Sequence, residues 1–377
     1  MSVSKKKRVA VVFGGRSTEH EVSLSSAINI LKNMDRDRYS IIPVKITRDG
    51  RWMLLPDVSE LRDVDDLSTK NGPYLLIGDP KNRGFFEIRD DGKGTAKFYR
   101  FIPVDVVFPV LHGTFGEDGT VQGMLSLADI PFVGAGVLAS SVSMDKIVMK
   151  QIFSKNQLPV PDFIWFLRKV WSSSPEIISE RVEEEIGFPC FVKPANTGSS
   201  VGVSKVHKRD ELKASVDNAA MYDRKIIVER AIKARELECS VLGNDDPQPS
   251  VVGEIIPANE FYDYEAKYIS EHSRTVIPAD IHESISKRVA ELAVQAFKAV
   301  DCAGMGRVDF LLETDTDRIF VNEINTIPGF TQISMYPKLW EASGISYSQL
   351  IDRLIELAEE RHSDLRRSKF RKDLLER

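Results

Sequence analysis

The sequence predicts an α/β domain with a doubly wound sheet, followed by a two-part α+β module. Near the amino end, a buried strand, an amphipathic helix and a second strand follow one another in the pattern of a βαβ unit. After about residue 140, strands alternate with glycine-rich turns and hairpins instead. A chain of 377 residues is too long for one ordinary core. We therefore expect three domains, at residues 1–140, 141–242 and 243–377.

The composition is that of a globular protein and excludes several classes of partner. Hydrophobic residues make up 42% and charged residues 28% of the chain, and the formal net charge of -5 provides no electrostatic footprint for nucleic acid. No stretch is long enough to cross a bilayer, and the basic start lacks the apolar run of a signal peptide. The 3 cysteines have no paired spacing, which indicates reduced thiols. We expect a cytoplasmic protein that binds neither nucleic acid nor membranes.

The first domain is predicted from its alternation of buried strands and one clear helix. Residues 8–15, "RVAVVFGG", form a buried strand that ends in glycines. Thr18 and Glu21 have the spacing of a capping box, which predicts that a helix begins there. The apolar positions of this helix fall on one face: Leu24, Ile28, Leu31 and Met34. Strands at 40–47 and 104–113 follow, and ligand-binding loops are expected at the carboxyl ends of such strands.

The later elements follow from helical periods, alternating strands and turn residues. A helix at 144–157 ends where the prolines of "LPVP" follow it. Further helices are expected at 210–222, 285–300 and 347–361. Strands are expected at 190–195, 201–207, 225–230, 237–243 and 250–258.

The segment "KPANTGSSVGVS", residues 193–204, is a candidate phosphate-binding turn. Its small residues are Gly198, Ser199, Ser200 and Gly202. Their backbone N–H groups can approach phosphate oxygens closely. The turn is not a Walker A loop, because a strand follows it, but a strand–glycine loop–strand lid covers phosphates in kinase-like folds. Lys146 and Lys193 would add positive charge, and the alternative is a plain glycine–serine hairpin.

A predicted hairpin near the carboxyl end carries polar side chains where a buried strand should be apolar. These are Arg307, Asp309, Glu323 and Asn325. A turn centred on Thr316 would pair Asp309 with Glu323. The same register pairs Arg307 with Asn325 on the same face of the hairpin. Two carboxylates and an amide oxygen suit Mg²⁺, which commonly shares its ligation with substrate phosphates. The alternative is a surface hairpin with a cross-strand salt bridge.

Two further segments have features of a nucleotide site. In "ERAIKARE", Glu229 and Glu236 offer carboxylates for ribose hydroxyls, and the backbone near Ile232 offers partners for a base edge. The alternative is a strand crossover with solvated charges. The aromatic loop at 259–275 contains Lys267 and Tyr268 and has no regular period. A long loop of this kind in a compact domain is predicted to be a lid over a site.

Taken in order, seven segments of the chain resemble the D-alanine–D-alanine ligase family of the ATP-grasp superfamily. They are "GGRSTEHEVS", "LHGTFGEDGTVQG", "SMDK", "FVKPANTGSSVGVS", "FYDYEAKY", "GRVDF" and "NEINTIPGFTQISMYP". The resemblance covers nearly the whole chain. Thr114 stands where the family often has proline, and Ala234 where it often has glycine, so only local loop geometry is affected.

The resemblance implies an ATP-grasp architecture and a reaction. The range 1–140 would be a Rossmann-like substrate domain, 141–242 a central ATP-binding domain, and 243–377 an ATP-grasp domain with the metal and catalytic residues. The reaction would join two D-alanines through an acylphosphate, releasing ADP and phosphate, for peptidoglycan precursor synthesis. ATP would be the co-substrate, two Mg²⁺ or Mn²⁺ ions would assist, and the protein would be a homodimer.

The resemblance also implies roles for individual residues. Asp309, Glu323 and Asn325 would hold the metal ions. The nucleotide would be bound by Lys146, Lys193, Gly198, Ser200, Gly202, Glu229, Ile232, Glu236 and Lys267. Arg307 and the N–H of Gly329 would stabilise the oxyanion. Substrates would be bound by Glu19, His112, Ser334 and Met335. Ser199 and Tyr268 would connect to Glu19 and hold the lid closed.

Three functions are open at this point. The first is D-alanine–D-alanine ligation. The second is a ligase of the same family that uses D-lactate or D-serine as its second substrate. Tyr268 favours the dipeptide over the ester, because depsipeptide-forming members typically lack this tyrosine. The third is a nucleotide-binding regulator without catalysis, which the metal-binding set, Arg307 and both lysines disfavour.

Overall fold

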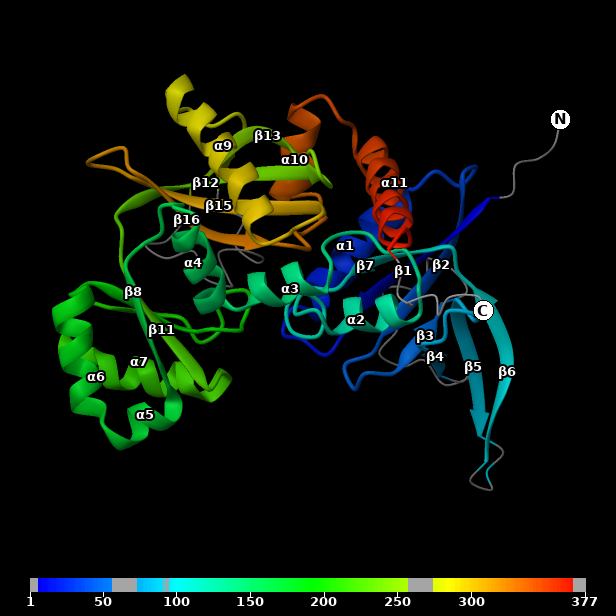
Figure 1. Cartoon of the computed structure of the whole chain (residues 1–377), viewed down its shortest axis with the longest axis horizontal. Helices are drawn as coiled ribbons and strands as arrows, with labels where there is room; N and C mark the ends of the chain where they lie inside the picture. The colour runs from blue at the N-terminus through cyan, green and yellow to red at the C-terminus, as the bar shows by residue number, and fades with distance from the viewer. Residues whose placement is uncertain (1–5, 56–72, 91, 93–94, 257–273, 369–377) are drawn as a thin grey trace, which may run out of the picture.

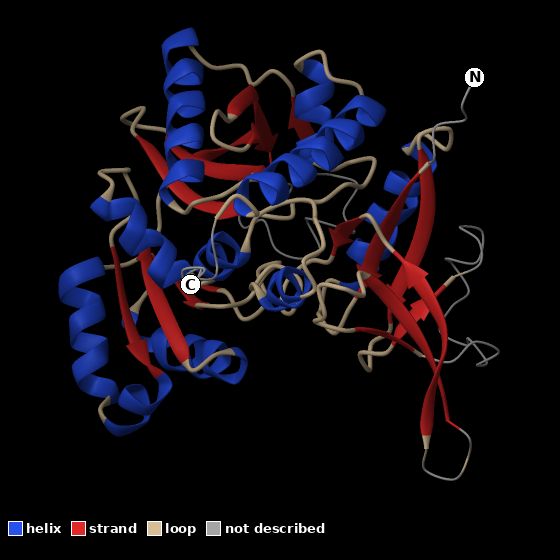
Figure 2. Ribbon diagram, turned by 45° about the vertical axis from the view of Figure 1, so that its right-hand side comes forward, coloured by secondary structure: helices blue, strands red, loops and turns tan. Residues whose placement is uncertain are grey.

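The computed structural model describes residues 6–55, 73–90, 92, 95–256 and 274–368 and contains three β-sheets (Figure 1). Helices and strands are mixed in each part of the molecule (Figure 2). The expected combination of α/β and α+β architecture is confirmed. The predicted lid loop, with Lys267 and Tyr268, lies outside the described residues.

The first sheet is built around the predicted βαβ unit. Strand β1 (Lys7–Gly14) lies between β2 (Tyr39–Ile46) and β7 (Val106–Val110) and is parallel to both. Helix α1 (His20–Asn33) connects β1 to β2. Successive β1 residues face opposite sides of the sheet, so one set packs under α1 and the other under α2 (Thr120–Leu127). The sheet is therefore covered by helices on both faces, as a doubly wound domain requires.

The same sheet continues as an antiparallel extension that the sequence did not predict. Its order is β6-β5-β4-β3-β2-β1-β7. The added strands are β3 (Trp52–Leu54), β4 (Tyr74–Leu76), β5 (Gly84–Asp90) and β6 (Ala96–Pro103). The hairpin of β5 and β6 projects from the molecule (Figure 1). These strands are short or interrupted by charged residues, which explains why the sequence shows no clear two-residue alternation of apolar and polar side chains there.

The predicted capping box at the start of α1 is wrong. Glu19 is the N-cap residue, and no side chain caps the helix. The Glu21 carboxylate pairs with Arg48 instead of turning back to the helix start. Ser17 orders this turn, because its hydroxyl accepts from the Glu19 N–H and donates to the carbonyl of His112. Glu19 is thereby available to face the interior of the molecule.

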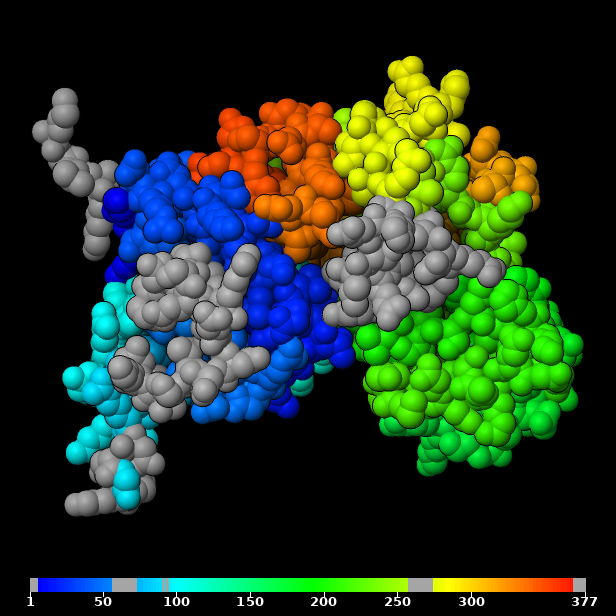
Figure 3. All heavy atoms as spheres, turned by 180° about the vertical axis from the view of Figure 1, so that it is seen from behind, coloured from blue at the N-terminus to red at the C-terminus, as the bar shows by residue number. Residues whose placement is uncertain are grey.

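The central sheet is antiparallel, in the order β10-β9-β11-β8. The strands are β8 (Phe163–Leu167), β9 (Cys190–Pro194), β10 (Ser204–Val206) and β11 (Lys225–Arg230). The helical segments of this unit are α5 (Arg168–Ser173), α6 (Pro175–Arg181), η3 (Val182–Ile186) and α7 (Arg209–Tyr222). The predicted strand–loop–strand is present as β9 and β10. Seen from behind, this unit forms a lobe of its own (Figure 3, green).

The third sheet has the order β14-β13-β12-β15-β16 and contains the polar hairpin. The strands are β12 (Ala234–Gly243), β13 (Gln248–Ile256), β14 (Arg274–Val276), β15 (Gly304–Glu313) and β16 (Ile319–Asn325). The helices near it are α3 (Val137–Met144), α4 (Lys146–Lys155), α9 (Glu283–Ala299) and α10 (Met335–Ala342). The predicted hairpin register is confirmed: Asp309 pairs with Glu323, and Arg307 with Asn325.

Two elements pack outside the domain to which their position in the sequence assigns them. Strand β12 lies at the end of the range 141–242 but pairs with β13 and β15 of the third sheet. Helix α11 (Tyr347–Leu365), in the range 243–377, packs against the first sheet, where Leu350 and Leu354 share a core with Val9 and Val11.

None of the described helices is both long and apolar enough to span a bilayer.

Candidate active site

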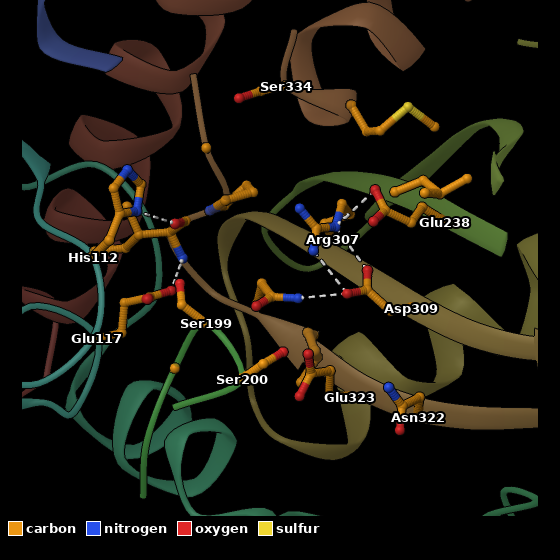
Figure 4. Close-up of a pocket in the computed structure, with 18 of the residues that line it drawn as sticks. His112, Glu117, Ser199, Ser200, Glu238, Arg307, Asp309, Asn322, Glu323 and Ser334 are labelled. Atoms are coloured by element: carbon orange, nitrogen blue, oxygen red, sulfur yellow. Dashed lines mark hydrogen bonds and ion pairs between the residues drawn. The ribbon is translucent and has the colours of Figure 1, made fainter. Parts of the chain in front are cut away.

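A cavity of about 710 Å³ lies where α1 and the loop after β7 meet the second and third sheets. Most of the predicted site residues line it: Glu19, His112, Lys146, Lys193, Gly198, Ser199, Ser200, Glu236, Arg307, Asp309, Glu323, Asn325, Gly329, Ser334 and Met335. They come from segments far apart in the chain, and Figure 4 shows how several of them converge. Gly202, Glu229 and Ile232 are not among its lining residues.

The β15–β16 hairpin forms an acidic wall of the cavity. The Arg307 guanidinium donates two hydrogen bonds to Asp309, each of 2.7 Å. The amide of Asn325 also donates to Asp309, at 2.9 Å. Glu323 lies opposite Asp309 on the neighbouring strand and is partly exposed to the cavity. The hairpin thus presents two carboxylates and an amide on one face, as its sequence predicted.

This donor set fits a hard divalent cation that shares its ligation with a substrate. Within the described residues, no group of three or more His, Cys, Asp and Glu side chains forms a metal cage. Mg²⁺ is usually bound by one or two protein carboxylates together with water and phosphate oxygens. Asp309 and Glu323 supply two such carboxylates, and the amide oxygen of Asn325 is a third hard donor.

Two lysines stand across from the acidic wall. Lys146, at the start of α4, has its Nζ 3.8 Å from Glu323 Oε2 and donates to the carbonyl of Thr197 at 2.8 Å. Lys193, on β9, donates to Glu229 Oε2 at 2.8 Å. Burial opposes the charge of Lys193, yet the neighbouring Glu229 raises its pKa. The Glu229 carboxylate therefore favours the charged form of Lys193 at the cavity wall.

Glu229 does not line the cavity but forms ion pairs behind its wall. Its side chain is 2% exposed and lies between Lys193 and Lys150 Nζ, at 3.5 Å from the latter. Burial alone would raise the pKa of this carboxyl group, but the two ammonium groups lower it. Lys150 also donates to the carbonyl of Asn322 at 3.0 Å, so it connects α4 to the hairpin. The structure thus gives Glu229 an ion-pair role that sequence alone did not predict.

The loop between β9 and β10 touches the start of α1. Ser199 Oγ donates to Glu19 Oε1, which confirms that these predicted partners meet. Ser199 and Ser200 have φ values of 50° and 60°, a region that favours glycine. A Cβ added at Gly198 would collide with Glu19 Oε2. Gly202 points elsewhere, since a Cβ there would meet Tyr222 and Pro194.

His112 is a buried, hydrogen-bonded imidazole at the cavity wall. It is 4% exposed, and its Nδ1 donates to the carbonyl of Ile327 at 3.0 Å. Its Nε2 lies 3.2 Å from Ser26 Oγ, which in turn accepts from the N–H of Phe330. Burial lowers the pKa of His112 despite the nearby charge of Glu19. The neutral ring therefore orders the loop that contains Gly329.

Comparisons with known proteins identify the family. Residues 8–135 match the family model "D-ala D-ala ligase N-terminus", and residues 152–356 match "D-ala D-ala ligase C-terminus". The chain belongs to the D-alanine–D-alanine ligase family. It is 50% identical over 361 residues to the D-alanine–D-alanine ligase of Thermoanaerobacter sp. (strain X514), covering 95% of this chain and 98% of that one. It is 49% identical over 372 residues to the ligase of Acetivibrio thermocellus, covering 95% and 97%.

Solved structures of ligases in this family have the same fold. The D-alanine–D-alanine ligase of Coxiella burnetii is 37% identical, with a TM-score of 0.82 and coverage of 97% of both chains. The VanG D-Ala:D-Ser ligase of Enterococcus faecalis is 38% identical, with a TM-score of 0.82 and coverage of 94% of this chain and 100% of that one. The ATP-grasp architecture of a ligase is therefore shown, and the family uses ATP and a divalent metal.

In this ligase fold, the cavity also contains residues to which the sequence assigned no role. They include Glu117, Glu238 and Lys338. Glu117 accepts from the N–H groups of Gly113, at 2.8 Å, and Ile327, at 3.1 Å. Burial, reinforced by the charge of Glu19, raises the pKa of Glu117 to about 8. Its position in the quoted "GTFGEDG" segment was a usable signal, but its contact with Ile327 exists only in the folded chain.

Proposed function

We propose that this chain joins two D-alanine molecules to D-alanyl-D-alanine, consuming ATP through an acylphosphate and releasing ADP and phosphate for peptidoglycan precursors. The observation that supports it most is the meeting, in one cavity, of the hairpin carboxylates with two lysines and with Glu19. Phosphoryl transfer needs mainly positioning and charge neutralisation, and these groups can provide both. The identities of 50% and 49% to D-alanine–D-alanine ligases, over nearly the full length of each chain, support the same reaction.

The nucleotide would lie between the acidic wall and the lysines. We infer that Lys146, Lys193 and the 197–202 loop bind its phosphates, with Glu236 toward the ribose. Asp309, Glu323 and Asn325 would hold two divalent ions, Mg²⁺ or Mn²⁺. Bound there, the ions would neutralise phosphate charge during transfer.

The two substrates would bind in the cavity that Arg307 lines. Glu19 would bind the ammonium group of the first D-alanine beside His112. The amine of the second D-alanine attacks the activated carboxyl carbon, and the resulting oxyanion would be stabilised by Arg307 and the N–H of Gly329. Ser334 and the N–H of Met335 would hold the carboxylate of the second D-alanine. The predicted latch through Tyr268 lies outside the described residues.

A second candidate is D-alanine–D-serine ligation. It is favoured by one observation, the similarity to the VanG D-Ala:D-Ser ligase over 94% of this chain. Product identification decides between the candidates. Purified protein is incubated with ATP, Mg²⁺ and D-alanine, alone or with equimolar D-serine or D-lactate, and the products are separated by mass. Mainly D-alanyl-D-alanine is expected, whereas a mixed product in excess would contradict the assignment.

The metal site is tested by the Glu323→Gln variant. The change removes a ligand charge without changing size, so turnover should fall about 100-fold or more while the fold and binding of an ATP analogue persist. Initial ADP release at fixed Mg²⁺ is the measurement. Glu313→Gln, at the far end of the same hairpin, is the matched control and should keep parental turnover. Near-parental ligation by Glu323→Gln would refute the site.

Two expectations concern the whole protein. We propose a homodimer, as the family resemblance implies, and location in the cytoplasm. Light scattering of the purified protein measures the first, and cell fractionation the second.

A further inference from the structure

Three carboxylates stand in one row across the third sheet. Glu238 on β12 pairs directly with Asp309 on β15, and Asp309 pairs with Glu323 on β16. All three line the cavity, and Figure 4 shows them together. Like charges placed directly opposite each other destabilise antiparallel strands. The row therefore depends on positive charge supplied from within the cavity.

Arg307 supplies this charge to two members of the row. Its Nε lies 3.0 Å from Glu238 Oε2 and 2.7 Å from Asp309 Oδ1. Its Nη2 donates to Asp309 Oδ2 at 2.7 Å. One guanidinium is thus shared between a carboxylate proposed to bind metal and another with no assigned role.

The exposure of the three carboxylates increases along the row. The side chains of Glu238, Asp309 and Glu323 are 7%, 16% and 25% exposed. A buried carboxylate without a partner is strongly disfavoured, because water cannot solvate it. Glu238 is therefore the carboxylate of the row that water can solvate least, whereas Asp309 and Glu323 are more open to the cavity.

We propose that Glu238 is a positioning residue that retains Arg307 when Asp309 binds a divalent cation. This rests on the proposed metal site. A cation on Asp309 weakens the hold of that carboxylate on the guanidinium and repels it. Glu238, on the side away from Glu323, keeps Arg307 in the cavity, where the oxyanion develops. Without Glu238, Arg307 loses its second carboxylate, is held more closely by Asp309 and competes there with the metal.

The test is a double-substitution cycle of Glu238→Gln and Arg307→Met, read by Mn²⁺ titration without nucleotide. Glu238→Gln alone should weaken Mn²⁺ binding about tenfold, because Arg307 then competes for Asp309. In the Arg307→Met background it should change the affinity less than about threefold, because the guanidinium that competes for Asp309 is then absent. An equal or larger loss in that background would make Glu238 a direct ligand and overturn the proposal.

Thermal unfolding provides a readout that does not depend on metal. Arg307→Met should lower Tm by removing the guanidinium that lies 3.0 Å from the buried Glu238 carboxylate, and adding Glu238→Gln should recover most of the loss. A double variant as unstable as the sum of its singles would overturn the pairing. In turnover assays, Glu238→Gln should lower kcat about tenfold and leave KM for ATP within about threefold.

Two further variants separate the possible failures. Glu254 is the matched control, because it is a buried carboxylate on β13 that pairs with Arg235 at 2.6 Å outside the cavity. Glu254→Gln should lower Tm but leave Mn²⁺ affinity and kcat at parental values. Asp309→Asn should weaken Mn²⁺ binding more than about tenfold. If Asp309→Asn leaves Mn²⁺ binding unchanged, both the proposed metal site and the role of Glu238 are refuted. If Asp309→Asn weakens Mn²⁺ binding but the double-substitution cycle shows no coupling, only the role of Glu238 is refuted.

Discussion

Glu117 is held by two backbone N–H groups at the point where the first domain meets the hairpin. These donors favour its ionised form, but burial and the charge of Glu19 outweigh them. A carboxyl group whose pKa is raised in the fold costs stability as pH rises toward that pKa, because the folded chain then keeps a proton that the unfolded chain has released. Glu117 therefore makes the fold sensitive to pH in a range where ordinary carboxylates no longer titrate.

The sign of this effect follows from the two pKa values, 4.5 for an ordinary glutamate and about 8 in the fold. Between these values the unfolded chain releases a proton that the folded chain retains, so stability falls as pH rises. Glu117→Gln cannot titrate. The difference in Tm, variant minus parent, should grow by at least about 2 °C from about pH 5.5 to about pH 8.5. A difference independent of pH would contradict the raised pKa.

Residues within one hairpin were predictable, and residues joined by tertiary contacts were not. The pairing of Asp309 with Glu323 followed from the two-residue period of strands and one turn. Glu238 was not assigned a role, because its pairing with Asp309 joins β12 to β15, which β13, β14 and α9 separate in the chain. Sequence periods report which face a side chain occupies but not which distant strand lies beside it.

At the scale of elements, the course of the backbone in the β9–β10 loop determines which residues the loop contacts. Both its strands and its small residues were predictable from sequence. Its approach to Glu19 was implied only by family resemblance, because the loop and α1 belong to different domains. The erroneous capping box has the same origin: Glu21 pairs with Arg48, a partner that a local pattern cannot reveal.

Gly198→Ala tests this close approach. The new methyl group would displace the Glu19 carboxylate, which is 6% exposed and has little room to move. The KM for the first D-alanine should rise about tenfold, while binding of an ATP analogue stays within about threefold. Steady-state kinetics and calorimetry measure the two effects. Gly123→Ala, where a Cβ meets no atom within 4 Å, is the control. Equal kinetics for both variants would show that the loop does not position Glu19.

At the scale of the whole molecule, α11 joins the last part of the chain to the first sheet. Its helical period was predicted for 347–361, but the period indicates only that one face is buried. Arg361 strengthens the joint by donating to the carbonyls of Phe132 and Gly134. Burial lowers the pKa of Arg361 to about 10, still well above neutrality. The guanidinium therefore stays charged and satisfies both carbonyls.

Arg361→Met should destabilise the protein by about 2–4 kcal/mol, because two buried carbonyls lose their donor. The loss should appear as a lower Tm and as faster amide exchange in β1. Arg353→Met is the control on the same helix, since its ion pair with Glu356 is about half exposed and should contribute less than about 1 kcal/mol. Similar losses for the two variants would show that α11 is not fixed through Arg361.

The packing of α11 against α1 and β7 also has a consequence for synthesis. The ribosome releases β1 and α1 early, but α11, which completes the cover of the same face of the sheet, emerges only after the other two sheets. At roughly 10 residues per second, about half a minute separates the two events. During that time Val9, Val11 and Phe13 present an apolar surface without its final cover. The first strands to be made are thus among the last to be finished, and a nascent chain is most exposed to chaperones over this face.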